Sequence, residues 1–189
     1  YGGGCDLHTW LNQYIFPAEA RLDSRAVAAG AGLGLAEMIA SGVTCVADMY
    51  MHTGTIAEQI LEAGISANLS CGGVYFGAPE DFSPETCGDC RNQAALTEEW
   101  HGAGAGQILV DASVHGEYTS NPPLWRWMAE YAAEHRLGMH VHVSETQSEH
   151  QASLERWGKT PIQALDGCGV WDCGRSLAAH CVYTTEEDW

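Results

Sequence analysis

Three histidines lie at the ends of apolar, strand-like runs, and their spacing is regular. His115 closes the run ILVDASVH, His142 lies in GMHVHVS, and His180 lies in LAAHCVY. The intervals of 27 and 38 residues each match about one strand–helix unit of a parallel sheet. Parallel strands of a barrel end on one face, so the three imidazoles are expected to converge there. Converging imidazoles suit metal binding or proton transfer, although any one alone would be explained as a hydrogen-bonded core histidine.

A carboxylate follows the second of these histidines. Glu145 comes three residues after His142, just past the end of the expected strand. A carboxylate beside a metal-bound water can take that water's proton and pass it to a leaving amine. By itself, Glu145 would be explained as an acidic residue at the start of a helix over 145–157, where the helix dipole favours negative charge. The neighbouring histidines favour the catalytic interpretation.

The elements that must position these side chains alternate between strands and helices. We predict strands over residues 43–50, 67–74, 108–115, 138–144 and 177–183. We predict helices over residues 24–40, 55–63, 92–100, 124–135 and 148–157. This alternation predicts parallel strands with crossover helices, in either an open doubly wound sheet or a (β/α)₈ barrel. No GxGxxG follows a strand and no GxxxxGKS or GxxxxGKT is present, so we predict no phosphate-binding loop.

The composition limits the partners of the chain. Its 189 residues suffice for one domain with a substantial core. The 25 acidic residues against 8 Lys and Arg give a net charge of −17, which argues against nucleic acid or anionic membrane as a partner. The sequence has no apolar run of 18 residues and opens without a signal peptide. We therefore expect a cytoplasmic protein with a small-molecule substrate, and a homo-oligomer is left open.

Eight cysteines are spread along the chain, and two of them form a CxxC motif. Cys87 and Cys90 lie in CGDC, within the Pro- and Gly-containing loop 78–92. A zinc site usually needs a second such pair at a suitable spacing, and the sequence has none. Cys71 could approach this loop in space. We expect reduced thiols, with a structural metal or a disulfide near this loop as the alternative.

The two ends of the sequence suggest a piece of a longer protein. It opens with Tyr1-Gly2-Gly3 and no methionine. It closes with TTEEDW at residues 184–189, which is typical of a helix N-terminus with a capping threonine and acids in the first turn. We therefore expect the chain to be a central fragment.

Four separate stretches of the sequence resemble one family. They are LHTWLNQYIFPAEARLDSRAV, GLAEMIASGVTCVADMY, VHVSET and AAHCVYTTEEDW. Together they are similar to the amidohydrolase superfamily, in its branch of S-adenosylhomocysteine and methylthioadenosine deaminases and chlorohydrolase-like enzymes. This resemblance implies a metal-dependent (β/α)₈ barrel, of which residues 1–189 would supply strands two to six. Strand one, strands seven and eight and the flanking β-sandwich would be absent.

The resemblance also implies roles for individual residues. His142 and His180 match metal ligands on the fifth and sixth barrel strands. Glu145 matches the proton shuttle, and His115 matches the fourth-strand histidine that meets the substrate near the metal. One divalent zinc ion is implied, and nitrogen and oxygen ligands would also accept iron or manganese.

Three further residues match positions that contact substrate. The resemblance implies that Trp10 packs on the nucleoside, that Glu19 accepts hydrogen bonds from ribose hydroxyls, and that Arg91 meets a substrate carboxylate. Each also has an ordinary structural explanation. Trp10 could be a core residue, Glu19 could cap a helix or form a salt bridge, and Arg91 could simply be solvated.

The sequence departs from the family pattern in places that bear on activity. The family has a His-x-His on its first strand and an aspartate on its eighth, and both are missing here. His140-Val141-His142 is not that motif, and we expect His140 in the barrel interior. Ser70-Cys71-Gly72 stands where this branch has serine-arginine-glycine, so an arginine for a substrate tail is missing. With two metal ligands we expect weak metal binding and no useful turnover by this piece alone.

The expected activity of the parent protein is hydrolytic deamination of an adenosine-type nucleoside. S-adenosylhomocysteine, methylthioadenosine and adenosine are the candidate substrates. Guanine or pterin deamination and chlorotriazine hydrolysis are alternatives within the same superfamily. An inactive fragment that acts only as a binding or assembly module is a further alternative. Whichever of these functions holds, five strands of a barrel leave two open sheet edges, and open edges favour aggregation.

Overall fold

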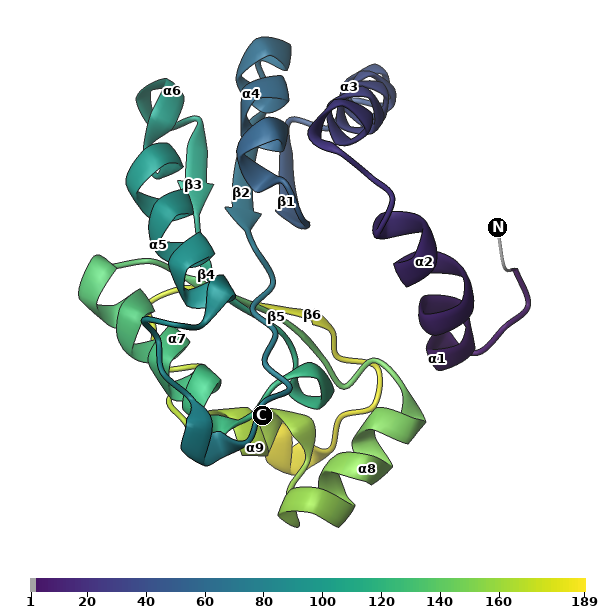
Figure 1. The fold of residues 1–189 in the computed structure, drawn as a ribbon, viewed down its shortest axis with the longest axis vertical. Coiled ribbons are helices and arrows are strands. Elements are labelled where there is room, and N and C mark those ends of the chain that lie inside the picture. The colour runs from purple at the N-terminus through teal and green to yellow at the C-terminus, as the bar shows by residue number, and fades with distance from the viewer. Residues whose placement is uncertain (1–2) are drawn as a thin grey trace.

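The structure is a computed structural model that describes residues 3–189. All of its paired strands run parallel, in two three-stranded sheets ordered β1-β2-β3 and β4-β5-β6 (Figure 1). The strands are β1 Cys45–Met49, β2 Ser66–Ser70, β3 Ile108–Val110, β4 Ala112–Gly116, β5 Met139–Val143 and β6 Ser176–His180. Each of the five predicted strands is present. The predicted strand 108–115 differs in being interrupted at Asp111, which separates β3 from β4.

The two sheets are successive parts of one curved wall. Gly73 forms a parallel bridge with Val114, and so continues the line of β2 alongside β4. A Cβ atom on Gly73 would lie 2.7 Å from the carbonyl oxygen of Ser113, so only glycine permits this approach. The glycines in the predicted strand 67–74 therefore allow the sheet to continue past the end of β2. Parallel strands with helices between them match the predicted partial (β/α)₈ barrel.

Helices connect and cover the strands. They are α1 Leu7–Trp10, η1 Leu11–Ile15, α2 Phe16–Glu19, α3 Ser24–Ala40, α4 Thr53–Ala63, η2 Pro79–Asp81, α5 Gly88–Trp100, α6 Ala103–Gly106, η3 Glu117–Thr119, α7 Pro122–His135, α8 Gln147–Trp157, α9 Pro161–Asp166 and η4 Glu186–Asp188. All five predicted helices are present, and α3 has the predicted bounds. The predicted helix start near the C-terminus is a single 3₁₀ turn, capped by the side chain of Thr185.

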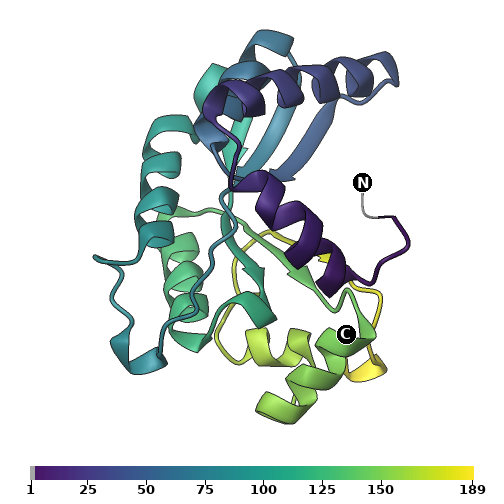
Figure 2. The ribbon, with the colours of Figure 1, turned by 45° about the vertical axis from the view of Figure 1, so that its right-hand side comes forward.

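One long helical segment was not predicted. Residues 7–19 form a continuous run of α1, η1 and α2, in which η1 is a π-helical turn. This segment, called the N-terminal helical run below, begins at Asp6, whose side chain accepts a hydrogen bond from the backbone N–H of Thr9. Figures 1 and 2 show it standing apart from the other helices, beside the ends of the strands.

The core has two parts, one for each sheet. Ile56 and Ile60 of α4 pack with Leu69 of β2 and Ile108 of β3 in the first part. The second part lies between the sheet β4-β5-β6 and helices α7 and α9, and it includes the fully buried Met128. Burial of such side chains contributes roughly 1.5–3 kcal/mol each to folding.

The two outermost strands remain open. Within the described residues, β1 pairs only with β2, and β6 pairs only with β5. Four of the five residues of β6 are exposed, including Leu177. Among residues 3–189, no helix is long and apolar enough to cross a membrane.

Candidate functional site

The predicted histidines meet at the C-terminal ends of their strands. The ring of His142 on β5 lies 5.2 Å from the ring of His115 on β4, measured between centroids. The same ring lies 5.4 Å from that of His180 on β6. The predicted convergence of three imidazoles is therefore present in the structure.

The backbone of His115 sets the tautomer of His142. The strand register shifts between Val114 and Gly116, so His115 occupies a β-bulge. Its carbonyl oxygen lies 2.9 Å from Nδ1 of His142. A carbonyl can only accept a hydrogen bond, so Nδ1 must carry the proton, and Nε2 keeps its lone pair. A neutral imidazole with a free Nε2 is the form that binds a metal ion.

Glu145 lies beside the third histidine. Its Oε2 atom is 3.6 Å from Nε2 of His180. The two side chains are 25% and 37% exposed, so both can be reached from solvent. His180 and the following Cys181 have positive φ angles of 76° and 49°. Strained backbone of this kind often occurs at functional sites, and here it follows directly on the strand end.

Burial keeps the imidazoles of His115 and His142 uncharged. Burial, aided by the nearby His142, lowers the pKa of His115 to about 4. Burial also lowers the pKa of His142, with the positive charge that His180 can carry acting in the same direction. The carbonyl of His115 opposes this shift. At neutral pH both side chains are therefore neutral and available as ligands or hydrogen-bond acceptors.

A buried carboxylate holds the turn that carries Glu145. Glu149, in the first turn of α8, is 6% exposed. Its oxygens accept hydrogen bonds from the backbone N–H groups of Ser144 at 2.8 Å and Glu145 at 2.7 Å. Ser144 has a positive φ of 53°, so the chain turns sharply there. This arrangement fixes where Glu145 leaves the strand.

His140 is part of the barrel interior, as predicted. It is 4% exposed, and its Nδ1 lies 3.0 Å from the hydroxyl of Ser70 on β2. Burial lowers the pKa of His140 to about 4. Its ring centroid is 5.8 Å from that of His142.

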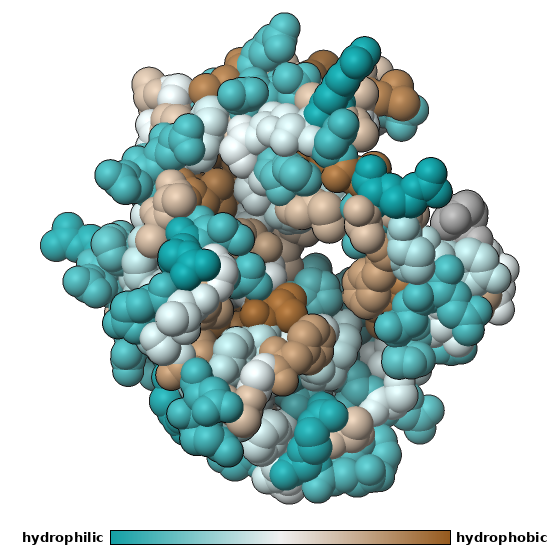
Figure 3. Space-filling view, in the orientation of Figure 1, coloured by the Kyte–Doolittle hydropathy of each residue, from teal (hydrophilic) through white to brown (hydrophobic). Residues whose placement is uncertain are grey.

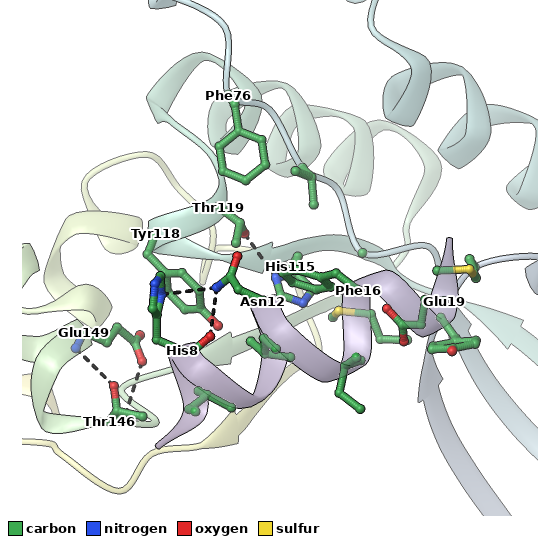
Figure 4. A pocket seen from close by; sticks show the side chains of 18 of the residues that line it. His8, Asn12, Phe16, Glu19, Phe76, His115, Tyr118, Thr119, Thr146 and Glu149 are labelled. Carbon is green, nitrogen blue, oxygen red and sulfur yellow. Dashed lines mark hydrogen bonds between the residues drawn. The ribbon is translucent and has the colours of Figure 1, made fainter. Parts of the chain in front are cut away.

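A large cavity adjoins the histidines. Its volume is about 860 Å³, and it lies between the N-terminal helical run and the ends of β1, β2 and β4. Figure 3 shows the molecule hollowed there, with hydrophobic side chains at the border. His115 and Glu19 both line this cavity, from opposite sides (Figure 4).

Two predicted substrate-contacting residues lie outside this cavity lining. Trp10 is on the N-terminal helical run, but its neighbours Leu7, His8 and Leu11 line the cavity in its place. Arg91 is on α5, and its Nη1 donates to the carbonyl oxygen of Glu85 at 2.7 Å. The assignments of Trp10 and Arg91 to substrate stay predictions.

Several lining residues were missed by reasoning from the sequence. They include His8, Asn12, Tyr118 and Glu149, which Figure 4 shows around the cavity. Glu149 had a signal, because Thr146 and Glu149 form a capping box, and a threonine followed three residues later by glutamate is its sequence signature. His8 and Asn12 are four residues apart on a helix that was not predicted, so their shared face could not be seen.

The cysteines are free thiols. Cys87 caps the N-terminus of α5, and Cys90 lies in its first turn, both buried. The Sγ atom of Cys71 donates to Oε1 of Gln93 at 3.4 Å. In residues 3–189, no group of three His, Cys, Asp or Glu side chains is placed to hold a metal ion. The assignments of His142 and His180 as metal ligands stay predictions.

Comparisons with known sequences give a consistent family. The amidohydrolase family profile matches residues 2–189. The 5-methylthioadenosine/S-adenosylhomocysteine deaminase of Caldanaerobacter subterraneus is 37% identical over 188 residues, covering 100% of this chain and 42% of the relative. The 5'-deoxyadenosine deaminase of Methanothermobacter thermautotrophicus is 38% identical over 183 residues, covering 97% of this chain and 41% of the relative. The chain thus spans about two fifths of the length of these curated relatives.

Solved structures share the fold. An adenosine deaminase from Xanthomonas campestris, solved with bound zinc, is 26% identical with a TM-score of 0.84, over 97% of this chain and 41% of that chain. A guanine deaminase from C. acetobutylicum with bound guanine is 20% identical with a TM-score of 0.86, over 100% of this chain and 46% of that chain.

Proposed function

Because the chain belongs to the amidohydrolase family, we propose that it forms the central part of a metal-dependent barrel that deaminates an adenosine-type nucleoside. The observation that carries this proposal is the meeting of His115, His142 and His180 at the strand ends, with Glu145 beside them. The curated relatives that match the chain are named as deaminases of methylthioadenosine, S-adenosylhomocysteine or 5'-deoxyadenosine. Methylthioadenosine, S-adenosylhomocysteine and adenosine are the proposed candidate substrates.

His142 and His180 would hold the metal ion. Their donor chemistry fits, because Nε2 of His142 keeps its lone pair while Nδ1 is bound to the carbonyl of His115. Zinc is the natural ion, and iron or manganese would also be accepted. Catalytic zinc usually has three protein ligands, so at least one more would come from outside residues 3–189. We propose that the remaining barrel strands supply it.

Glu145 would carry protons between the attacking water and the leaving group. A divalent ion supplies Lewis acidity, which lets water attack at neutral pH. Glu145 would accept a proton from that water and deliver it to the departing amine, which leaves as ammonia. A hydroxyl group then replaces the amino group on the ring.

His115 would meet the reacting ring. Its Nδ1 lies 3.1 Å from the hydroxyl of Thr119, and that hydroxyl donates to the carbonyl oxygen of Gly116. The Thr119 oxygen can then accept from Nδ1–H, which leaves Nε2 of His115 as an acceptor. A neutral Nε2 at the cavity wall could accept a hydrogen bond from the amino group of the purine and orient it. Trp10, Glu19 and Arg91 remain proposed contacts to the nucleoside.

Other functions remain as competing proposals. Guanine or pterin deamination and chlorotriazine hydrolysis would use the same histidines, with a different substrate bound in the cavity. A binding or assembly module would need no turnover, and the open edges of β1 and β6 would then serve pairing. We propose the cytoplasm as the location, because all eight cysteines are free thiols.

Metal content and ammonia release test the proposed function together. The full gene product should contain about one divalent ion per chain by elemental analysis and release ammonia from adenosine-type nucleosides. His142→Ala should lose both, whereas His135→Ala, an exposed residue on α7, should keep both. Ammonia from guanine but from no nucleoside would overturn the substrate assignment. A metal-free, inactive full product would favour the module.

A further inference from the structure

The wall of the large cavity carries carboxylates, and none of the described residues that line it is lysine or arginine. Its two histidines are His8, which is exposed, and His115, which burial keeps neutral. Three lining residues are acidic, namely Glu19, Asp89 and Glu149. Asp89 belongs to the CGDC motif, and its Oδ2 accepts a hydrogen bond from the backbone N–H of Val74 at 2.8 Å. The motif therefore contributes a fixed carboxylate to the wall.

One thiol and two phenol groups of the wall stay uncharged at neutral pH. Burial raises the pKa of the Cys71 thiol to about 11. Burial also raises the pKa of Tyr118 and of Tyr50 to about 12, with Glu145 and Glu19 respectively adding to the effect. None of these side chains supplies a cation, and Arg91 is directed to the carbonyl of Glu85.

Much of the remaining wall is apolar. Leu11, Ile15 and Phe16 line it from the N-terminal helical run, and Met49 and Met51 line it from the end of β1. Methionine thioethers are flexible and polarizable, so they adapt to small apolar groups and to sulfur. A thioether or a hydrocarbon can be buried here without an unpaired charge.

We propose that this cavity selects nucleosides with a small, uncharged 5'-substituent and rejects those whose 5'-substituent carries a carboxylate. This proposal rests on the proposed function, because it concerns the substrate of the same site. Methylthioadenosine and 5'-deoxyadenosine are of the first kind. S-adenosylhomocysteine is of the second, because its amino-acid tail ends in a carboxylate and an ammonium group.

The physical reason is the cost of an unpaired buried anion. A carboxylate that leaves water needs a cation or several hydrogen-bond donors in return. Among the described residues of this wall it would meet three carboxylates and no lysine or arginine, and like charges repel. The ammonium group of the same tail could meet Glu19 or Asp89, so the carboxylate alone is the group that is rejected.

Ligand binding without turnover isolates this selection. The full gene product is stripped of metal with a chelator, and dissociation constants are measured by isothermal titration calorimetry. The ligands are adenosine, methylthioadenosine, 5'-deoxyadenosine and S-adenosylhomocysteine. The fifth ligand is decarboxylated S-adenosylhomocysteine, which lacks only the carboxylate. Methylthioadenosine should bind at least 10-fold more tightly than S-adenosylhomocysteine. The decarboxylated analogue should recover most of that difference.

A cation added to the wall should reverse the preference. Phe76 lines the cavity and is 79% exposed, so arginine can replace it without disturbing the core. Phe76→Arg should tighten binding of S-adenosylhomocysteine relative to methylthioadenosine by at least 5-fold. Phe76→Gln is the matched control without charge and should not tighten it. Met51→Arg, at a position 38% exposed, provides a second site for the same test.

The outcomes separate this proposal from the proposed function. If nucleosides bind but S-adenosylhomocysteine binds as tightly as methylthioadenosine, the selection is wrong and the deaminase assignment stands. If none of the five ligands binds, both are wrong. A gain for S-adenosylhomocysteine in Phe76→Arg that also occurs in Phe76→Gln would show that charge is not the cause, and this too would overturn the proposal.

Discussion

Asp111 lies where β4, β5 and β6 begin, and His115, His142 and His180 lie where the same strands end. Asp111 is fully buried, and its carboxylate is surrounded by donors. It accepts from the side chain of Asn68, from the backbone N–H of Gly138 at 2.9 Å, and from the guanidinium of Arg175. We call this the lower network.

The histidine end is organised differently. The imidazoles of His115 and His142 are held neutral by burial, and the backbone has positive φ at Ser144, His180 and Cys181. Neutral imidazoles can take up a proton or a ligand, whereas the charge of Asp111 is already matched. The Asp111 end of the strands therefore serves stability. The histidine end keeps uncharged imidazoles available at some cost in stability.

The largest loss of stability should come from breaking the lower network. Asp111→Ala leaves the buried N–H of Gly138 and the amide of Asn68 without their acceptor, and we expect a loss of about 3–4 kcal/mol in the free energy of unfolding. The Arg175 side chain is 48% exposed, so water can replace its contact. Urea denaturation measures this, with Glu130→Ala on α7 as a surface control. A loss below about 1 kcal/mol would contradict the comparison.

The pH dependence of stability should report the neutral histidines. His140 has a pKa of about 4 in the folded chain against about 6.5 when unfolded, so the unfolded chain binds more protons between these values. Its contribution is complete above pH 6.5 and is lost as the pH falls toward 4, by up to about 3–4 kcal/mol at 1.4 kcal/mol per pKa unit.

The measurement is the free energy of unfolding across this pH range, in a metal chelator. His140→Gln should show a shallower dependence than the wild type, because its side chain does not titrate. His135→Gln, at the exposed end of α7, should follow the wild type. Equal slopes in all three proteins would show that His140 is not held neutral by the fold.

A milder change at the lower network tests its close packing. In Gly138→Ala the new Cβ would clash with Oδ1 of Asp111, which must therefore move. We expect a loss of about 2 kcal/mol, within the usual range for overpacked sites. Thermal unfolding measures this loss, with Gly30→Ala in α3 as the control, because Gly30 has open space around it. Gly106→Ala is unsuitable as a control, because Gly106 has a positive φ. Equal stability in the two variants would contradict the close packing.

At the histidine end, Glu149→Gln should cost about 1 kcal/mol, because one of the two acceptor oxygens becomes a donor facing the turn. Its effect on turnover of the full gene product should be larger than its effect on folding, since the turn positions Glu145. A steady-state assay at matched folded fractions checks this. Unchanged turnover would mean that the turn holds its shape without Glu149.

The smallest loss of stability should come from His142→Ala. Only one hydrogen bond, to the carbonyl of His115, is removed at a partly exposed site, so we expect under about 1 kcal/mol. Metal binding should nevertheless fall by at least 10-fold, as elemental analysis after dialysis would show. A loss of stability as large as that of Asp111→Ala would mean that both ends serve the fold alike.

Local signals in the sequence predicted most of the elements. Helix α3 was found with its bounds because its sequence is rich in Ala and Leu and Ser41-Gly42 ends it, and the structure shows that Asp23 caps its start. The short helix α9 was missed although Thr160, Pro161 and Gln163 form a capping box at its start. The N-terminal helical run was missed because Pro17 interrupts an otherwise helical pattern.

The sequence by itself determined which residues come at the strand ends, because alternating strands and helices and their spacing are local properties of the chain. The alternation left an open doubly wound sheet or a barrel, and the resemblance to a family selected the barrel. In a barrel, the spacing then predicted the meeting of three histidines and the place of Glu145. Only the tertiary structure decided the tautomer of His142, since that depends on a bulge in the neighbouring strand. It also decided which side chains line the cavity. Asp89 and Glu149 reach one wall from positions 60 residues apart, and contacts over such separations depend on how helices pack, which no local pattern encodes.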